Sequence, residues 1–187
     1  MKNRPVQPHF FVCLAAIAAL LLGACGKKPP PQPTWSFEPN AIQINYTSDP
    51  MLNSFDGRAH TLLLVIYQLT DVNAWSDLAK GEPGLRKLLQ AQKFDQSVVS
   101  LDKYIIQPSE DKAITLYRSE NARWVALVAG YYQLFPGKSS MAFDIPVLIK
   151  KHGLIFRKTT ATVEHLPLNL FFGPTELHEL QLEDEEF

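Results

Sequence analysis

The sequence has no surplus of basic residues. Its 187 residues hold 18 Lys and Arg against 19 Asp and Glu, so the formal net charge is −1 at pH 7. A nucleic-acid-binding protein needs a clustered basic face, and this composition supplies no excess charge with which to build one. We therefore expect no nucleic-acid partner.

Common enzyme and metal-site motifs are also missing. None of the five histidines belongs to a His-x-x-His pair or a His-Glu-x-x-His zinc helix. No Gly-x-Ser-x-Gly elbow, phosphate-cradling loop or glycine-rich dinucleotide turn occurs either. We expect no catalytic residues, metal or cofactor, and interpret the chain as an interaction module, although an enzyme built from scattered residues would escape such a search.

Long hydrophobic runs are missing as well. The apolar run from Phe10 to Leu22 is too short to cross about 30 Å of hydrocarbon as a helix. It follows Lys2 and Arg4 and precedes small residues, which is the order of a secretory signal. We interpret residues 1–24 as a signal peptide.

The segment Leu21-Leu22-Gly23-Ala24-Cys25 resembles a bacterial lipobox. The resemblance implies that Cys25 becomes the first residue and carries a covalent lipid of three acyl chains. Two or more chains anchor a protein stably, so we expect a tethered protein rather than a spanning one. Gly26 stands where lipoproteins kept at the inner membrane usually have Asp, which favours the inner leaflet of the outer membrane, facing the periplasm.

The two cysteines are both accounted for by this interpretation. Cys13 leaves with the signal peptide and Cys25 is acylated, so no thiol remains for a disulfide, a metal or a nucleophile. Stability must come from a buried core, and about 160 residues can form one. Residues 25–39 form a Pro-rich tether, which could hold the domain roughly 30–40 Å from the bilayer.

Short strands dominate the sequence after the tether. Ile42, Ile44 and Tyr46 alternate with polar residues, as in a half-buried strand. Two unbroken apolar runs, 62–69 and 124–132, predict strands that are buried on both faces. With further strands predicted at 97–106, 113–117, 145–149 and 156–165, the pattern indicates a mainly all-β fold, a two-sheet β-sandwich over residues 40–166.

A helical insertion is predicted at 73–93. Asn73 is placed to cap its first helix, and apolar residues recur at helical spacing. Helices this short are marginal alone, so we expect them to pack on the outer face of the 62–69 strand. The apolar residues of this stripe are Trp75, Leu78, Leu85, Leu88 and Leu89.

Residues 167–187 are interpreted as a C-terminal extension. Its apolar part, Leu168 to Phe172, should dock as a strand or an ordered arm. Leu177 and Leu180 could mark one helical turn, and the acidic end at 183–186 is typical of a solvated terminus.

A long connection precedes the 62–69 strand. Connections of more than a dozen residues in compact domains are usually functional or disordered. Apolar side chains on such a loop either pack beneath it or contact a partner. We regard its centre as the candidate partner-binding site: Met51, Leu52, Asn53, Ser54, Phe55, Asp56 and Gly57.

From the lipobox to about His165, the chain resembles the type VI secretion outer-membrane lipoproteins, the TssJ family. Where the family shows a Leu-Asn-Pro…Gly-Arg-Pro loop before an Arg-Ile-Tyr-Gln-Leu strand, Ser54 replaces the proline and Val65 the arginine. The resemblance is carried by Leu52-Asn53, Asp56-Gly57-Arg58, Val65 to Leu69, the helices from Trp75 to Leu89, Ile106-Gln107-Pro108, and Val125 to Tyr132.

This resemblance implies a transthyretin-like sandwich with a small two-helix insertion and no enzymatic activity. It further implies docking of the 51–57 loop onto the periplasmic C-terminal domain of TssM, which assembles with TssL, and a link to the outer membrane. The alternatives are a small-molecule or cell-wall-binding periplasmic lipoprotein, and an assembly lipoprotein of another secretion machine such as type IV. A ligand binder needs an apolar pocket, whereas a docking protein needs a few anchors on a loop.

Overall fold

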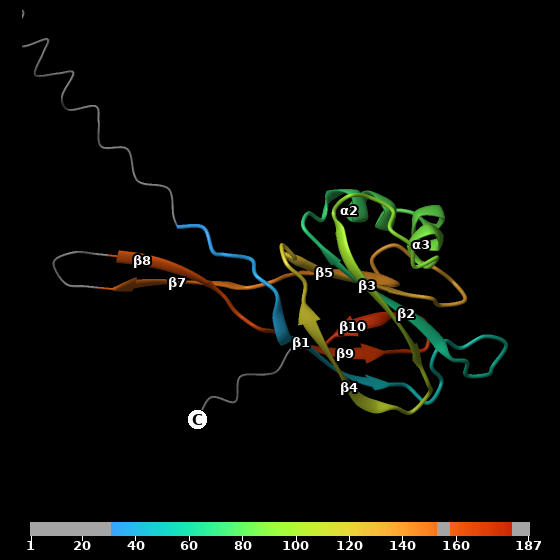
Figure 1. Ribbon diagram of the computed structural model, residues 1–187. Coiled ribbons are helices and arrows are strands. Elements are labelled where there is room, and N and C mark those ends of the chain that lie inside the picture. The colour runs from blue at the N-terminus through green and yellow to red at the C-terminus, as the bar shows by residue number, and fades with distance from the viewer. Residues whose placement is uncertain (1–30, 153–157, 181–187) are drawn as a thin grey trace, which may run out of the picture. The chain divides into compact units, whose positions relative to one another are not determined.

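The computed structural model describes residues 31–152 and 158–180 (Figure 1). The predicted signal peptide, Cys25 and the acidic end at 183–186 therefore lie outside the described residues. Within the described ranges, no helix is long and apolar enough to cross a membrane.

Two four-stranded sheets make up the sandwich. The first has the strand order β10-β9-β1-β4, in which β1 pairs antiparallel with β4 and parallel with β9. Its strands are β1 Glu38–Ser48, β4 Asp111–Arg118, β9 Leu166–Phe172 and β10 Leu177–Glu179. The second has the order β3-β2-β5-β6 and is antiparallel throughout. Its strands are β2 Leu62–Leu69, β3 Val98–Ile106, β5 Trp124–Ala129 and β6 Ser140–Asp144.

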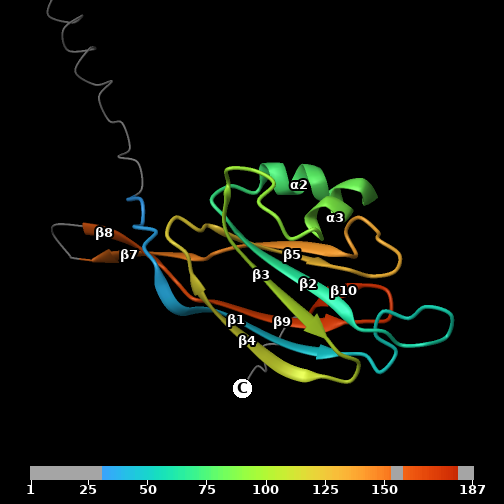
Figure 2. The same cartoon turned by 45° about the vertical axis from the view of Figure 1, so that its right-hand side comes forward.

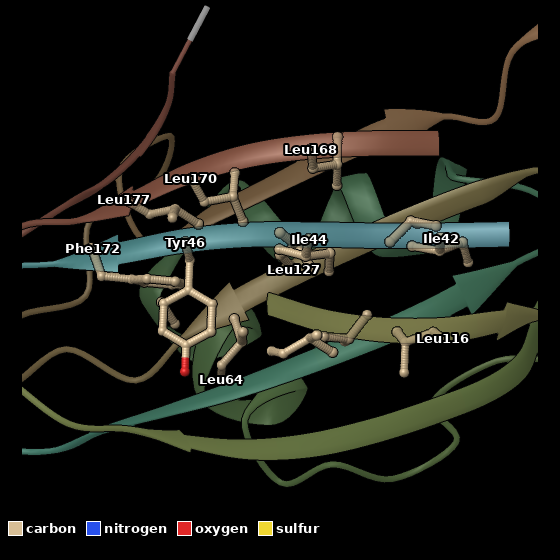
Figure 3. Packing of buried hydrophobic residues seen from close by; sticks show 14 of the residues in the cluster. Ile42, Ile44, Tyr46, Leu64, Leu116, Leu127, Leu168, Leu170, Phe172 and Leu177 are labelled. Atoms are coloured by element: carbon tan, nitrogen blue, oxygen red, sulfur yellow. The ribbon is translucent and has the colours of Figure 1, made fainter. Parts of the chain in front are cut away.

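The core lies between the two sheets. The alternating residues Ile42, Ile44 and Tyr46 of β1 are buried in one cluster with Leu64 of β2 and Leu127 of β5 (Figure 3). Because successive side chains of a strand point to opposite faces, the alternation seen in the sequence places Ile42, Ile44 and Tyr46 together in this core. The predicted β-sandwich is confirmed.

Two short helices cover the outer face of β2, as predicted. They are α2 Asn73–Ala79 and α3 Glu82–Leu88. Trp75, Leu85 and Leu88 are buried in a second cluster with Val65 and Tyr67 of β2. The predicted capping by Asn73 is wrong, since this residue already belongs to the helix and the cap position is Val72.

The predicted domain boundaries need correction at both ends. Strand β1 begins at Glu38, inside the stretch assigned to the tether. The sandwich also does not end at residue 166, because β9 lies between β10 and β1 and its alternating apolar side chains are buried. Residues 167–180 are thus part of the sheet, and Leu177 begins a strand rather than the predicted helical turn.

The predicted strand at 156–165 has a different role from the one expected. Strand β8, Lys158–Val163, pairs with β7, Val147–His152, in a separate two-stranded sheet. This hairpin extends beyond the sandwich (Figures 1 and 2). Pro146 directly precedes β7, in agreement with a proline at a strand end.

We predict that Leu88→Ala lowers the free energy of unfolding by about 2–5 kcal/mol, because it leaves a cavity between α3 and β2. Leu88 is 0% exposed. Lys87→Ala, at the exposed neighbouring position, is the control and should change the free energy by less than about 0.5 kcal/mol. Thermal melts of both variants check this, and equal melting temperatures would mean that the helices do not cover β2.

Candidate docking surface

The loop between β1 and β2, residues 49–61, lies at the end of β1 opposite to residues 31–37 (Figures 1 and 2). The loops β5–β6 and β9–β10 contact it there. The Ser54 N–H donates to the carbonyl of Pro174 at 2.8 Å, and the Tyr132 N–H donates to Asn53 Oδ1 at 2.8 Å. Three loops thus form one end of the sandwich.

The sequence of the β1–β2 loop specifies its turns. Asp49 accepts the Met51 N–H on its side chain at 2.6 Å, a local bond that Asp forms readily in turns. Phe55 and Arg58 exchange two backbone hydrogen bonds of 3.0 Å. Between them Asp56 and Gly57 have φ of +51° and +70°, and Asp-Gly is favoured where both turn residues need positive φ. The loop therefore ends in a small, hydrogen-bonded hairpin tip.

The side chains of Leu52 and Asn53 are buried under the backbone of the loop. This corrects the prediction that these two residues contact a partner. Leu52 is 0% exposed and belongs to the sandwich core. Asn53 is buried, donates to the carbonyl of Thr61 at 2.9 Å and accepts from Tyr132. Because buried backbone groups need hydrogen-bond partners, the Asn53 amide joins the loop to its own last residue, Thr61, and to Tyr132 of the β5–β6 loop.

Aromatic side chains form the exposed part of this end. Phe55 is 51% exposed and stacks on Tyr132, which is 49% exposed, with 4.4 Å between ring centroids and 11° between planes. The ring of His60 contacts Tyr132 edge-on at 4.9 Å. Met51 is exposed on the same loop, as are Asp56 and Gly57, while Ser54 is half-buried. We call Met51, Phe55, Asp56, Gly57 and Tyr132 the loop-end surface.

Two hollows adjoin this surface. One of about 220 Å³ is lined by Phe55, Tyr132 and Pro174 among others. A larger one, about 760 Å³, lies beside Tyr132 and reaches Arg86 and Ile105. The exposed rings can insert into pockets of a partner protein, and the hollows beside them can accept side chains of that partner. Interface anchors bind in this way.

A salt bridge joins the other two loops to each other. Lys138 of the β5–β6 loop bonds to Glu176 of the β9–β10 loop at 3.0 Å, and this bond lowers the pKa of the Glu176 carboxyl. Burial raises the pKa of Tyr131 on the β5–β6 loop. Among the side chains that the structure describes, no cluster of three or more His, Cys, Asp or Glu is arranged to hold a metal ion.

The sequence did not single out Tyr132 or His60. The apolar run 124–132 predicts a strand that includes Tyr132, but β5 ends at Ala129. Gly130 was the available signal, because glycine weakens a strand interior and often marks its end. His60 carries no local pattern, since its ring lies on Tyr132 only through the fold.

We predict that Leu52→Ala lowers the free energy of unfolding by about 2–5 kcal/mol, because the loop is held down by this core side chain. Met51→Ala is the matched control on the adjacent, 41% exposed residue, and should change it by less than about 0.5 kcal/mol. Urea denaturation measures both values. If the two variants were equally stable, Leu52 would not be the buried anchor of the loop.

Comparison with known proteins gives the context of this fold. The T6SS-SciN family model, described as type VI secretion lipoprotein with VasD, EvfM and TssJ, matches residues 40–161. No curated protein matches the chain.

Solved structures of low identity share the fold. The T6SS lipoprotein TssJ1 from Pseudomonas aeruginosa is 19% identical, with a TM-score of 0.57 over 78% of this chain and 98% of that one. Lip from Serratia marcescens, a membrane-bound component of the type VI secretion system, is 13% identical, with a TM-score of 0.57 over 79% and 99%. A chain in the structure described as the T6SS protein TssM C-terminal domain from EAEC is 13% identical, with a TM-score of 0.55 over 75% and 98%.

The family match covers well over half of the 187 residues and spans β1, both helices and the β1–β2 loop. The matched structures reproduce the β-sandwich over nearly their whole lengths. The chain therefore belongs to the type VI secretion lipoprotein family of VasD, EvfM and TssJ.

Proposed function

We propose that this chain is the outer-membrane lipoprotein of a type VI secretion membrane complex, and that its loop-end surface docks onto the periplasmic C-terminal domain of TssM, which assembles with TssL. The observation that carries this proposal is the exposed stack of Phe55 on Tyr132. It stands on a loop that the buried Leu52 and Asn53 hold in place.

The fixed conformation of the β1–β2 loop favours tight docking. Ordering a loop on association costs free energy, so a loop that is already held in place loses less. Here the backbone bonds between Phe55 and Arg58, and the Asn53 bonds to Thr61 and Tyr132, define the loop without a partner. Phe and Tyr add large contact areas with few rotatable bonds.

The direction of β1 supports the proposed location. Its eleven residues span about 36 Å, with residues 31–37 at one end and the β1–β2 loop at the other (Figure 1). A lipid on Cys25 would hold the domain at the membrane through the tether, which joins the domain at the start of β1. The loop-end surface would then face the periplasm, where a domain of TssM can reach it.

The family context supports a docking role over catalysis. The family is one of secretion-system lipoproteins, and one matched chain comes from a structure described by its TssM C-terminal domain. The geometry around Phe55 supplies contact area rather than reacting groups. We therefore propose a non-enzymatic link between the outer membrane and the inner-membrane part of the complex.

We predict that Phe55→Ala weakens binding to the periplasmic domain of TssM at least tenfold, about 1.4 kcal/mol, since a central aromatic anchor often carries 2 kcal/mol or more. Phe37→Ala is the matched control: Phe37 is 58% exposed and packs on Tyr117 at 5.3 Å, at the opposite end of β1. Isothermal titration calorimetry gives both affinities. Unchanged affinity in Phe55→Ala, or a loss in Phe37→Ala, would move the interface elsewhere.

We predict that Cys25→Ala releases the domain from outer-membrane fractions as a folded soluble protein, because the acyl chains are the anchor. Gly26→Asp should move the lipidated protein toward the inner membrane in a host that uses this sorting rule. Membrane fractionation after a high-salt wash measures both. A Cys25→Ala protein that still pellets with the outer membrane after the wash would contradict lipid anchoring.

A further inference from the structure

The β7–β8 hairpin lies at the end of the sandwich where residues 31–37 enter (Figures 1 and 2), and some of its apolar side chains are exposed. Val147, Leu148 and Ile149 are 38%, 39% and 50% exposed. In the described part of the chain, β7 and β8 form a sheet with each other alone. A two-stranded hairpin is marginal in water, so a surface that covers these side chains would stabilise it.

The register of the hairpin gives it an amphipathic face. Residues directly opposite in an antiparallel pair share a face, and every second residue follows them. Val147 opposite Val163, Ile149 opposite Ala161 and Lys151 opposite Thr159 therefore lie on one face. This face is apolar near the sandwich and basic farther out. Leu148 and Lys150 repeat the order on the other face.

The charge of the hairpin segment sets it apart from the rest of the chain. The sequences of β7 and β8 contain Lys150, Lys151 and Lys158 and no acidic residue, whereas the whole chain has a net charge of −1. A surface that combines apolar and basic side chains is typical of proteins bound at a membrane interface. Anionic headgroups attract such a segment, and salt screens the attraction.

The hairpin lies beside the start of the folded domain. A hollow of about 360 Å³ is lined by Thr34 and Phe37 together with Ala161 and Val163 of β8. The backbone carbonyl of Trp35 accepts the Asn121 N–H at 2.8 Å, so the chain is fixed from this point. The same end of the domain therefore carries both residues 32–37 and the hairpin.

The tether is long enough for the acyl chains and the hairpin to reach the same leaflet. The residues between Cys25 and Trp35 span about 28 Å when extended in a Pro-rich conformation, and β7 spans about 20 Å. Acyl chains at Cys25 and the hairpin can thus reach one leaflet together. A second copy of the hairpin is a poorer occupant, because equal basic segments repel each other.

We infer that the β7–β8 hairpin binds the anionic phospholipid leaflet that holds the acyl chains, with Ile149 in the apolar interface and Lys150 and Lys151 at the lipid phosphates. Two attachments restrict rotation of the domain, so the loop-end surface is kept away from the membrane. The orientation of the domain depends on the proposed lipid anchor at Cys25, whereas binding of the hairpin to the leaflet does not. Binding of the hairpin itself is testable without acyl chains, and TssM binding is measured separately.

The test uses the mature chain with Cys25→Ala, sedimented with vesicles of phosphatidylethanolamine and phosphatidylglycerol or of phosphatidylcholine alone. We expect at least tenfold tighter binding to the anionic vesicles, weakened by salt. Combining Ile149→Ser, Lys150→Gln and Lys151→Gln should reduce binding at least tenfold. The control combines Val99→Ser and Lys103→Gln at exposed positions of β3 and should bind as before. Failure to sediment with anionic vesicles, or equal binding of the hairpin variant, overturns the inference.

A second measurement does not depend on the triple variant folding. In the lipidated protein, Val147→Cys, on the same face of the hairpin as Ile149, supplies a single free thiol for an environment-sensitive dye, because acylation occupies Cys25. On anionic vesicles the dye emission should shift to the blue at Val147→Cys and stay unchanged at Val99→Cys. Equal emission at both sites, or a hairpin-dependent dimer in place of the shift, overturns the inference. The hairpin variant should keep its affinity for the TssM domain.

Discussion

Burial of β2 on both faces is the constraint on which the rest of the structure depends. Leu64 and Ile66 pack into the core between the sheets, while Val65 and Tyr67 pack beneath α2 and α3. An uncovered face of this kind would expose a row of apolar side chains, so the helical insertion is required. Because β1 and β2 lie in different sheets, the chain between them must cross from one sheet to the other, and this crossing is the candidate docking loop.

Much of the fold could be predicted because local periodicity records burial. Unbroken apolar residues in 62–69 predicted a strand covered on both sides, and helical spacing from Trp75 to Leu88 identified its cover. The C-terminal strands could be predicted only in part. Leu168 to Phe172 is apolar enough to require docking, but its parallel pairing with β1 depends on partners more than a hundred residues away. Local patterns carry no information about such pairing.

The candidate site was harder to predict, because a loop pattern does not separate inward from outward side chains. Leu52 and Phe55 are both apolar and three residues apart, yet Leu52 is buried and Phe55 is half exposed. The turn at Asp49 and the tip at Asp56-Gly57 decide this difference. Tyr132 joins the surface from another loop, and the sequence alone gave no reason to bring it there.

The central claim is that the loop end, and not the tether end, contacts TssM. Site-specific photo-crosslinking in cells tests it most directly, with p-benzoylphenylalanine in place of Phe55, on the loop after β1, or of Phe37, directly before β1, both of which are exposed. The account predicts a crosslink to TssM from position 55 and none from position 37. A crosslink from position 37 alone, or from neither position in an assembled complex, would contradict it.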